Sequence, residues 1–216
     1  MADRFPVSEP LEIGFVRRVL LAAEIVDGVT LRPVTSGIRV SASGLRQRPR
    51  INASGFYVWL EEGDRQAGDI VVEALHSGFE STQAAPTALP GHVRIELTPT
   101  PRYRFTTGAT ALRATLRESL FGPSVPVANA RIRLQWSDDN GWNDARLVSI
   151  SAANGDFAVA LRLAAADEAR SLPNGDLAVR LKVERDGVVR TSDEIPLRQG
   201  AVSAWRQAFI WDELLP

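Results

Sequence analysis

The stretch INASGFYVW at residues 51–59 has a counterpart, SAANGDFAV, at residues 151–159. In each stretch a short polar turn with a glycine leads directly into aromatic and β-branched residues, which favour strands. Glycine suits such a turn because it accepts a positive φ angle without strain. The recurrence of this pattern one hundred positions later indicates that the chain contains two related units.

Matching blocks surround both stretches in the same order. The five pairs of blocks, first copy then second, are 20–26 and 111–118, 32–40 and 125–134, 51–59 and 151–159, 68–75 and 175–183, and 94–97 and 193–197. The second pair reads RPVTSGIRV and VPVANARIRL, and the fourth reads GDIVVEAL and GDLAVRLKV. Five blocks in register predict an internal duplication.

The blocks alternate apolar and polar residues with a period of two, which predicts antiparallel strands with one buried face. The second copy gives the predicted core positions Leu112, Ala114, Leu116, Ala130, Ile132, Leu134, Trp136, Phe157, Val159, Leu161, Leu177, Val179, Leu181 and Val183. In the first copy FYVWL and DIVVEAL are apolar at both phases, so we expect those strands to be covered on both faces. The outward Arg113, Arg117, Arg131 and Arg133, on strands expected to be neighbours, either suit an acidic partner or keep that face soluble.

The sequence therefore predicts an all-β fold of two tandem antiparallel β-sandwiches, transthyretin-like or Ig-like, with a short apolar C-terminal tail. The expected divisions are an N-terminal extension at 1–17, a first sandwich at 18–98, a linker at 99–109, a second sandwich at 110–198 and an aromatic tail at 199–216. The segment LTPTPRYRFTTGAT (97–110) contains two prolines, which stiffen an extended connection. We expect the two sandwiches to sit nearly rigidly end to end.

The turn motifs carry a resemblance. GPSVPVANARIRL (122–134) with SAANGDFAV, and LRPVTSGIRV (31–40) with INASGFYVW, resemble the carboxypeptidase regulatory-like module, a transthyretin-like β-sandwich. The resemblance covers residues 18–97 and 110–198 and implies a non-catalytic appendage or scaffold repeat. Paired modules of this kind also resemble accessory proteins of phage-tail-like contractile injection particles.

Related adhesin repeats cross-link themselves by an isopeptide bond from a lysine in the opening strand. The only lysine here, Lys182, lies in a late strand at an outward position, so no such bond is expected.

Composition removes several chemistries. The chain has no cysteine and a net charge of −1, so no disulfide, thiolate site, nucleic-acid partner or anionic membrane partner is expected. No apolar signal segment is visible at the start, which predicts a cytoplasmic protein that is free or part of an assembled particle. His76 and His92 both lie close to glycines (HSG and PGH) and are expected in loops. With no nucleophile or phosphate-loop motif, the sequence predicts no enzyme and no cofactor.

The acidic run SDDNGWND (137–144) has two interpretations. Its carboxylates suit weak calcium binding, whereas Asn140-Gly141 between two strands predicts a tight hairpin. Trp142 is expected at the hairpin tip, where an exposed aromatic beside Asn143 and Asp144 suits carbohydrate stacking. A carbohydrate-binding module is therefore the alternative function.

The tail AVSAWRQAFIWDELLP (201–216) is too apolar to remain in water unaided. Val202, Trp205 and Phe209 lie at the spacing of one helix face. The tail either folds back over a sandwich edge or docks into another protein. In the second case Trp205, Phe209, Ile210, Trp211 and Leu214 are the partner-binding residues, and the function is a non-enzymatic structural or adaptor protein with protein partners in a larger, phage-tail-like assembly.

Overall fold

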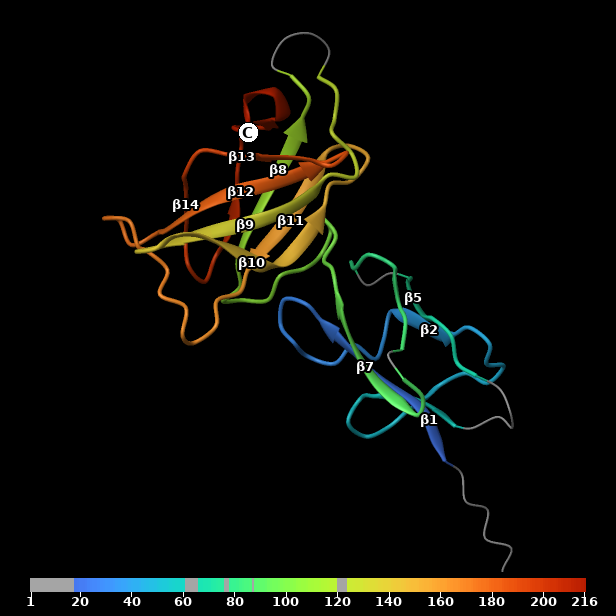
Figure 1. Ribbon diagram of the computed structural model, residues 1–216. Coiled ribbons are helices and arrows are strands. Elements are labelled where there is room, and N and C mark those ends of the chain that lie inside the picture. The colour runs from blue at the N-terminus through green and yellow to red at the C-terminus, as the bar shows by residue number, and fades with distance from the viewer. Residues whose placement is uncertain (1–17, 61–65, 76–77, 87, 120–123) are drawn as a thin grey trace, which may run out of the picture.

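The computed structural model describes residues 18–60, 66–75, 78–86, 88–119 and 124–216. The expected N-terminal extension (1–17) and His76 lie outside these described residues. Figure 1 shows two β-structured halves joined end to end, which we call the first half (18–97) and the second half (110–216). No helix in the described part of the chain is long and apolar enough to cross a membrane.

The strands of the first half are β1 (Val19–Asp27), β2 (Ile38–Ala42), β3 (Arg50–Ile51), β4 (Tyr57–Leu60), β5 (Ile70–Ala74), β6 (Thr82–Ala84) and β7 (Gly91–Leu97). They form one sheet in the order β3-β4-β1-β7 and a second in the order β2-β5-β6. β1 pairs antiparallel with β4 and parallel with β7.

The elements of the second half are β8 (Thr110–Arg117), β9 (Arg131–Asp138), β10 (Gly141–Ile150), β11 (Asp156–Leu161), β12 (Leu177–Arg185), β13 (Val188–Thr191), β14 (Ile195–Leu197), β15 (Val202–Ala204), β16 (Phe209–Ile210) and a 3-10 helix (Trp211–Glu213). One sheet has the order β10-β9-β12-β13, with β14 also on β12. In the other, β8 lies between antiparallel β11 and the parallel strands β15 and β16. The predicted all-β fold is confirmed.

The recurring turn glycine has a packing role in both halves. Gly55 and Gly155 have φ angles of +83° and +81°, a region that L side chains rarely adopt. A Cβ on Gly55 would lie 2.9 Å from Pro33, and one on Gly155 would lie 3.2 Å from Pro126. Each glycine therefore seats the turn on the proline of the preceding Pro-Val block, which explains why the two motifs recur together.

The period-two alternation locates the core correctly. All of the core positions predicted for the second copy, Trp136 among them, belong to one buried cluster. The first half has its own cluster, in which Trp59, Leu21 and Ile25 are almost fully buried. Each half therefore packs its two sheets around a separate apolar core.

The predicted correspondence of the fifth pair of blocks, 94–97 with 193–197, is wrong. Residues 94–97 belong to β7, which lies parallel beside the opening strand β1. Residues 193–197 instead contain β14, which lies antiparallel beside β12. The true counterparts of β7 are β15 and β16, which lie parallel beside β8. The expected tail is therefore the closing strand of the second copy.

The strand that is buried on both faces lies in the second copy, whereas the sequence predicts such strands in the first copy. In β4 and β5 one face is buried, whereas Val58, Leu60 and Val71 on the other face are partly exposed. In β11 both faces are buried, because Ala158 and Ala160 at its outward positions are covered as completely as its core residues. Alanine permits this because its small side chain leaves room for a second layer of chain.

The first prediction concerns the closing strand. Phe209 is 8% exposed and packs on Phe157, with ring centroids 6.2 Å apart. Replacing Phe209 with alanine should lower the free energy of unfolding by about 3 kcal/mol, because a cavity replaces a buried ring. Urea unfolding followed by circular dichroism measures this change, with the exposed Arg206→Ala as the control. A truncation after Gly200 should lose the folded second half, and a truncated chain with native stability would contradict this assignment.

Candidate functional site

The linker between the halves is bound to the second half by one arginine. Arg113 projects from β8, and its two terminal nitrogens donate hydrogen bonds to the carbonyl oxygens of Pro101 and Tyr103. Its guanidinium also lies over the Phe105 ring, 5.1 Å from the ring centroid. Hydrogen bonds from a charged group are stronger than neutral ones, so this side chain fixes the path of the linker.

The same linker is bound to the first half by a tyrosine. The buried Tyr103 hydroxyl donates a 2.5 Å hydrogen bond to a carboxylate oxygen of Asp27, at the end of β1. Burial raises the pKa of Tyr103, and the hydrogen bond to Asp27 raises it further. Asp27 also accepts hydrogen bonds from the backbone of Val29 and the hydroxyl of Thr30. Tyr103 therefore holds both the linker and the turn that follows β1.

This turn packs directly on the second half. Ala111, Leu147 and Ala160 form a small buried cluster with Val29 of the turn and Phe105 of the linker. A Cβ on Gly28 would lie 2.6 Å from the Leu97 carbonyl oxygen and 3.0 Å from the Leu147 side chain, so only glycine fits there. Ala111 of β8, Ala160 of β11 and Leu147 of β10 therefore form the surface on which the turn of the first half and the linker rest.

A second arginine closes this contact, which we call the junction. Arg162, just after β11, donates one hydrogen bond to the Gly28 carbonyl oxygen and lies 3.4 Å from a Glu96 carboxylate oxygen. Asp27, Tyr103 and Arg162 belong to none of the sites that the sequence predicts. Their signal is weak, although an arginine and a tyrosine alternating in RYRF within a linker indicate that the segment is packed rather than free.

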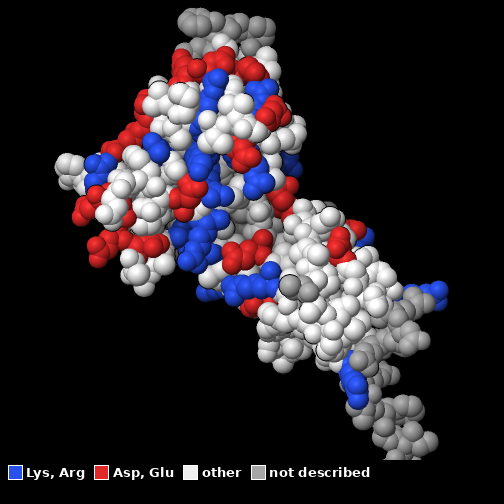
Figure 2. Space-filling view, viewed as in Figure 1, with Lys and Arg blue, Asp and Glu red and all other residues white. Residues whose placement is uncertain are grey.

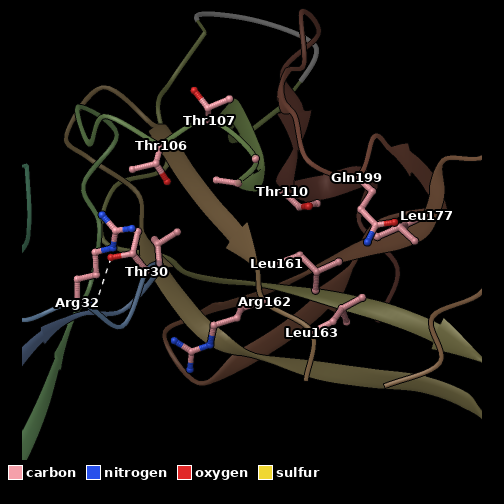
Figure 3. Close-up of a pocket in the computed structure, with 13 residues that line it drawn as sticks. Thr30, Arg32, Thr106, Thr107, Thr110, Leu161, Arg162, Leu163, Leu177 and Gln199 are labelled. Carbon is pink, nitrogen blue, oxygen red and sulfur yellow. Dashed lines mark hydrogen bonds between the residues drawn. The ribbon is translucent and has the colours of Figure 1, made fainter. Parts of the chain in front are cut away.

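A cleft of about 520 Å³ opens beside the junction. Figure 3 shows the residues that line it: Thr30 and Arg32 from the first half, Thr106 and Thr107 from the linker, and Thr110, Leu161 and Leu163 from the second half. Its polar lining is mainly hydroxyl groups, and the Arg162 guanidinium is already bonded across the junction. The cleft is therefore the space left where the two halves and the linker meet.

The residues predicted to bind a partner through the tail are buried in the second half. Phe209, Ile210, Trp211 and Leu214 are 8–9% exposed, and Trp205 is partly buried against the same core. Arg190 lies over the Trp211 ring at 4.8 Å from its centroid and donates to its carbonyl oxygen. The tail thus folds back, as strands rather than as the expected helix, and these side chains do not form an exposed anchor.

The alternative, carbohydrate-binding residues also have partners within the chain. Trp142 is the second residue of β10 rather than a hairpin tip, and the Arg180 guanidinium lies over its ring, 4.5 Å from the centroid. Asn143 hydrogen-bonds to the Asp138 carboxylate. Asp144 accepts hydrogen bonds from Gln135 at 2.6 Å and from Lys182 at 2.8 Å. Arg180 therefore covers one face of the Trp142 ring, and Asn143 and Asp144 already form hydrogen bonds within the chain.

The predicted hairpin forms at the acidic run. Asp138 accepts hydrogen bonds from the backbone N–H groups of Asn140 and Gly141. These bonds, chiefly the one from Asn140, lower the pKa of Asp138 although some desolvation acts to raise it. Among the described residues no group of three or more metal-ligating side chains converges. His92 is not in a loop as expected but is an exposed residue of β7, where it packs on Phe56.

The four outward arginines do not form one surface. Arg113 and Arg117 lie on β8, whereas Arg131 and Arg133 lie on β9 in the opposite sheet. The expectation that their strands are neighbours is therefore wrong. Arg113 serves the junction, and Arg117 donates to the Ser124 carbonyl oxygen. Lys182 lies on β12 at a partly exposed outward position, as expected, and forms an ion pair with Asp144.

No protein-family model and no curated protein matches the chain. Among solved structures, the Bacillus anthracis TIE protein matches with 12% identity and a TM-score of 0.29 over 87% of this chain. A streptococcal ancillary pilin matches with 11% identity and a TM-score of 0.25 over 87% of this chain, and GBS52, a minor pilin of Streptococcus agalactiae, with 9% and 0.29 over 86%. This chain spans 33%, 62% and 93% of those three chains. Likeness at these values adds no information on function.

The second prediction concerns Asp144. Partial burial would raise its pKa, but the hydrogen bonds from Lys182 and Gln135 and the charges of Lys182 and Arg133 outweigh that effect and lower it. A lowered pKa in the folded state stabilises the fold above the ordinary carboxylate pKa of about 4, and this contribution disappears as the pH falls below it.

Asp144→Asn should therefore be less stable than the native chain at pH 7, and the difference should shrink by pH 3. Urea unfolding at both pH values measures it, and Asp139→Asn, in the same hairpin, is the matched control. A stability difference that stays constant between pH 7 and pH 3 would refute the assigned role of this carboxylate.

Proposed function

We propose that this chain is a non-enzymatic structural or adaptor protein that holds protein partners at a fixed separation and orientation within a larger assembly. The observation that carries the proposal is the junction. Two halves of one chain ordinarily move relative to each other unless their contact is extensive or specific. Here hydrogen bonds from Arg113, Tyr103 and Arg162 cross-connect the first half, the linker and the second half.

The junction suits a spacer because two of its hydrogen bonds join groups far apart in the sequence. Tyr103 and Asp27 are separated by 76 positions, and Arg162 and Gly28 by 134. Bending the two halves apart would break these bonds and expose Ala111, Ala160 and Leu147 to water. The net stability that such hydrogen bonds contribute, about 0.5–1.5 kcal/mol each and more where one group is charged, opposes such bending.

The proposal extends to the organisation and setting of the protein. It includes a first sandwich at residues 18–98 and a linker at 99–109, with both sandwiches related to the carboxypeptidase regulatory-like module. It also places the protein in the cytoplasm, within a phage-tail-like contractile particle. These finer assignments rest on the sequence resemblance and on composition.

The third prediction tests the junction. Arg113→Ala leaves the Pro101 and Tyr103 carbonyl oxygens without their charged donor, so the linker should detach and the halves should reorient. Small-angle X-ray scattering should then show an increased maximum dimension and a broader distance distribution. Arg117→Ala is the matched control, because that arginine lies on the same strand and its hydrogen bond to Ser124 lies within its own half.

Circular dichroism checks that both variants remain folded, as expected because each half has its own core. If the native chain itself scatters as two independently oriented bodies, the junction is not rigid and the proposal of a spacer fails.

A further inference from the structure

Two rows of side chains cross the outer face of the sheet formed by β10, β9, β12 and β13. In the first row Val148, Arg133 and Lys182 are direct cross-strand neighbours. In the second row Ile150, Arg131, Glu184 and Val189 occupy the same strands two positions further along. A shallow groove of about 270 Å³ runs between the rows. The basic side chains thus lie at the centre of the face, and the aliphatic ones lie at its sides.

This face carries more positive than negative charge. Its basic residues include Arg131, Arg133, Arg180 and Lys182, and its carboxylates include Asp144 and Glu184, in a chain whose net charge is −1. Figure 2 shows basic side chains over the region where β9 and β12 lie in Figure 1, whereas the first half is largely uncharged on the same side. Basic side chains therefore outnumber acidic ones on this sheet face.

The basic groups retain unused hydrogen-bonding capacity. Arg133 and Lys182 are directly opposite, which is unfavourable for like charges, and they share one oxygen of Asp144. Arg131 is 60% exposed and only reaches Glu184 at 3.8 Å. Exposed pairs of this kind contribute about 0–1 kcal/mol and exchange readily for another carboxylate. An ammonium has three donors and a guanidinium five, so an incoming carboxylate finds free donors here.

We infer that this surface, which we call the basic groove, binds an acidic protein segment with apolar residues beside its carboxylates. The aliphatic sides support the apolar part, because Ile150 and Val189 are 36% and 43% exposed at outward positions of the sheet. The carboxylates within the groove disfavour a nucleic acid, since a continuous phosphate backbone would pass over Asp144 or Glu184. Side chains spaced along a peptide place their charges only where the cations lie.

This inference deepens the proposed function and rests on it, because it names the chemistry of one partner of the adaptor. The groove lies wholly on the second half and contains no junction residue. Binding to the groove and rigidity of the junction can therefore succeed or fail separately.

The test uses the full chain and a fluorescein-labelled 12-residue peptide in which glutamates alternate with serine and valine. Fluorescence anisotropy at low salt should show binding that weakens as salt is added. The double variant R131E/K182E should weaken binding at least tenfold, because it reverses two charges at the centre of the groove. The matched control R48E/R206E changes the net charge equally on exposed residues elsewhere and should change binding less than twofold.

Two further measurements separate the outcomes. Peptides with lysine in place of glutamate should not bind, and a double-stranded DNA oligonucleotide should bind more weakly than the acidic peptide. No binding of the acidic peptide to the native chain, equal losses in both double variants, or tighter binding of DNA would each overturn the inference. Arg113→Ala should bind the acidic peptide with native affinity. The peptide measurement therefore tests the basic groove even if the junction proves not to be rigid.

Discussion

The arrangement of the two halves depends on the pair of hydrogen bonds that Arg113 donates to the linker. Its guanidinium bonds two carbonyl oxygens of the linker and so fixes the position of Tyr103. Tyr103 then reaches Asp27, which holds the turn after β1, and the Gly28 carbonyl oxygen in that turn accepts a hydrogen bond from Arg162 in the second half. The chain of contacts begins and ends on the sheet of β8 and β11. Because each group is placed by the one before it, loss of the first would release the others.

The two copies share a topology but differ in what their sheets carry. β4-β1-β7 in the first half corresponds to β11-β8-β15 in the second. The outward positions of β4 are valine and leucine and remain partly exposed, whereas those of β11 are alanines and are buried, Ala160 in a cluster with Val29 of the first half. Small side chains allow the close approach of a second backbone. The duplication has therefore produced one half that docks and another that receives it.

The sequence predicts those features of the fold that depend on residues close together in the chain. Alternation identifies the core strands of the second copy, and the glycine turns identify where strands begin. The parallel pairing of the opening and closing strands joins residues far apart, so no local period shows it. In the tail, the chance helical spacing of Val202, Trp205 and Phe209 conceals two short strands. Besides RYRF in the linker, the outward Ala158 and Ala160 are a local signal of the junction, since outward positions elsewhere in the copy are mostly charged or polar.

The dominance of arginine over lysine has a structural consequence at these sites. A guanidinium is planar and offers parallel donors, so Arg113 satisfies two carbonyl oxygens at once and Arg162 joins a carbonyl and a carboxylate. A lysine ammonium at either position is a single point charge and would leave one acceptor without a fixed partner. The only lysine, Lys182, lies on an open sheet face opposite Arg133, where a point charge shares the Asp144 carboxylate. Arginine is thus required where two segments must be fixed together, and lysine suffices where a surface only needs charge.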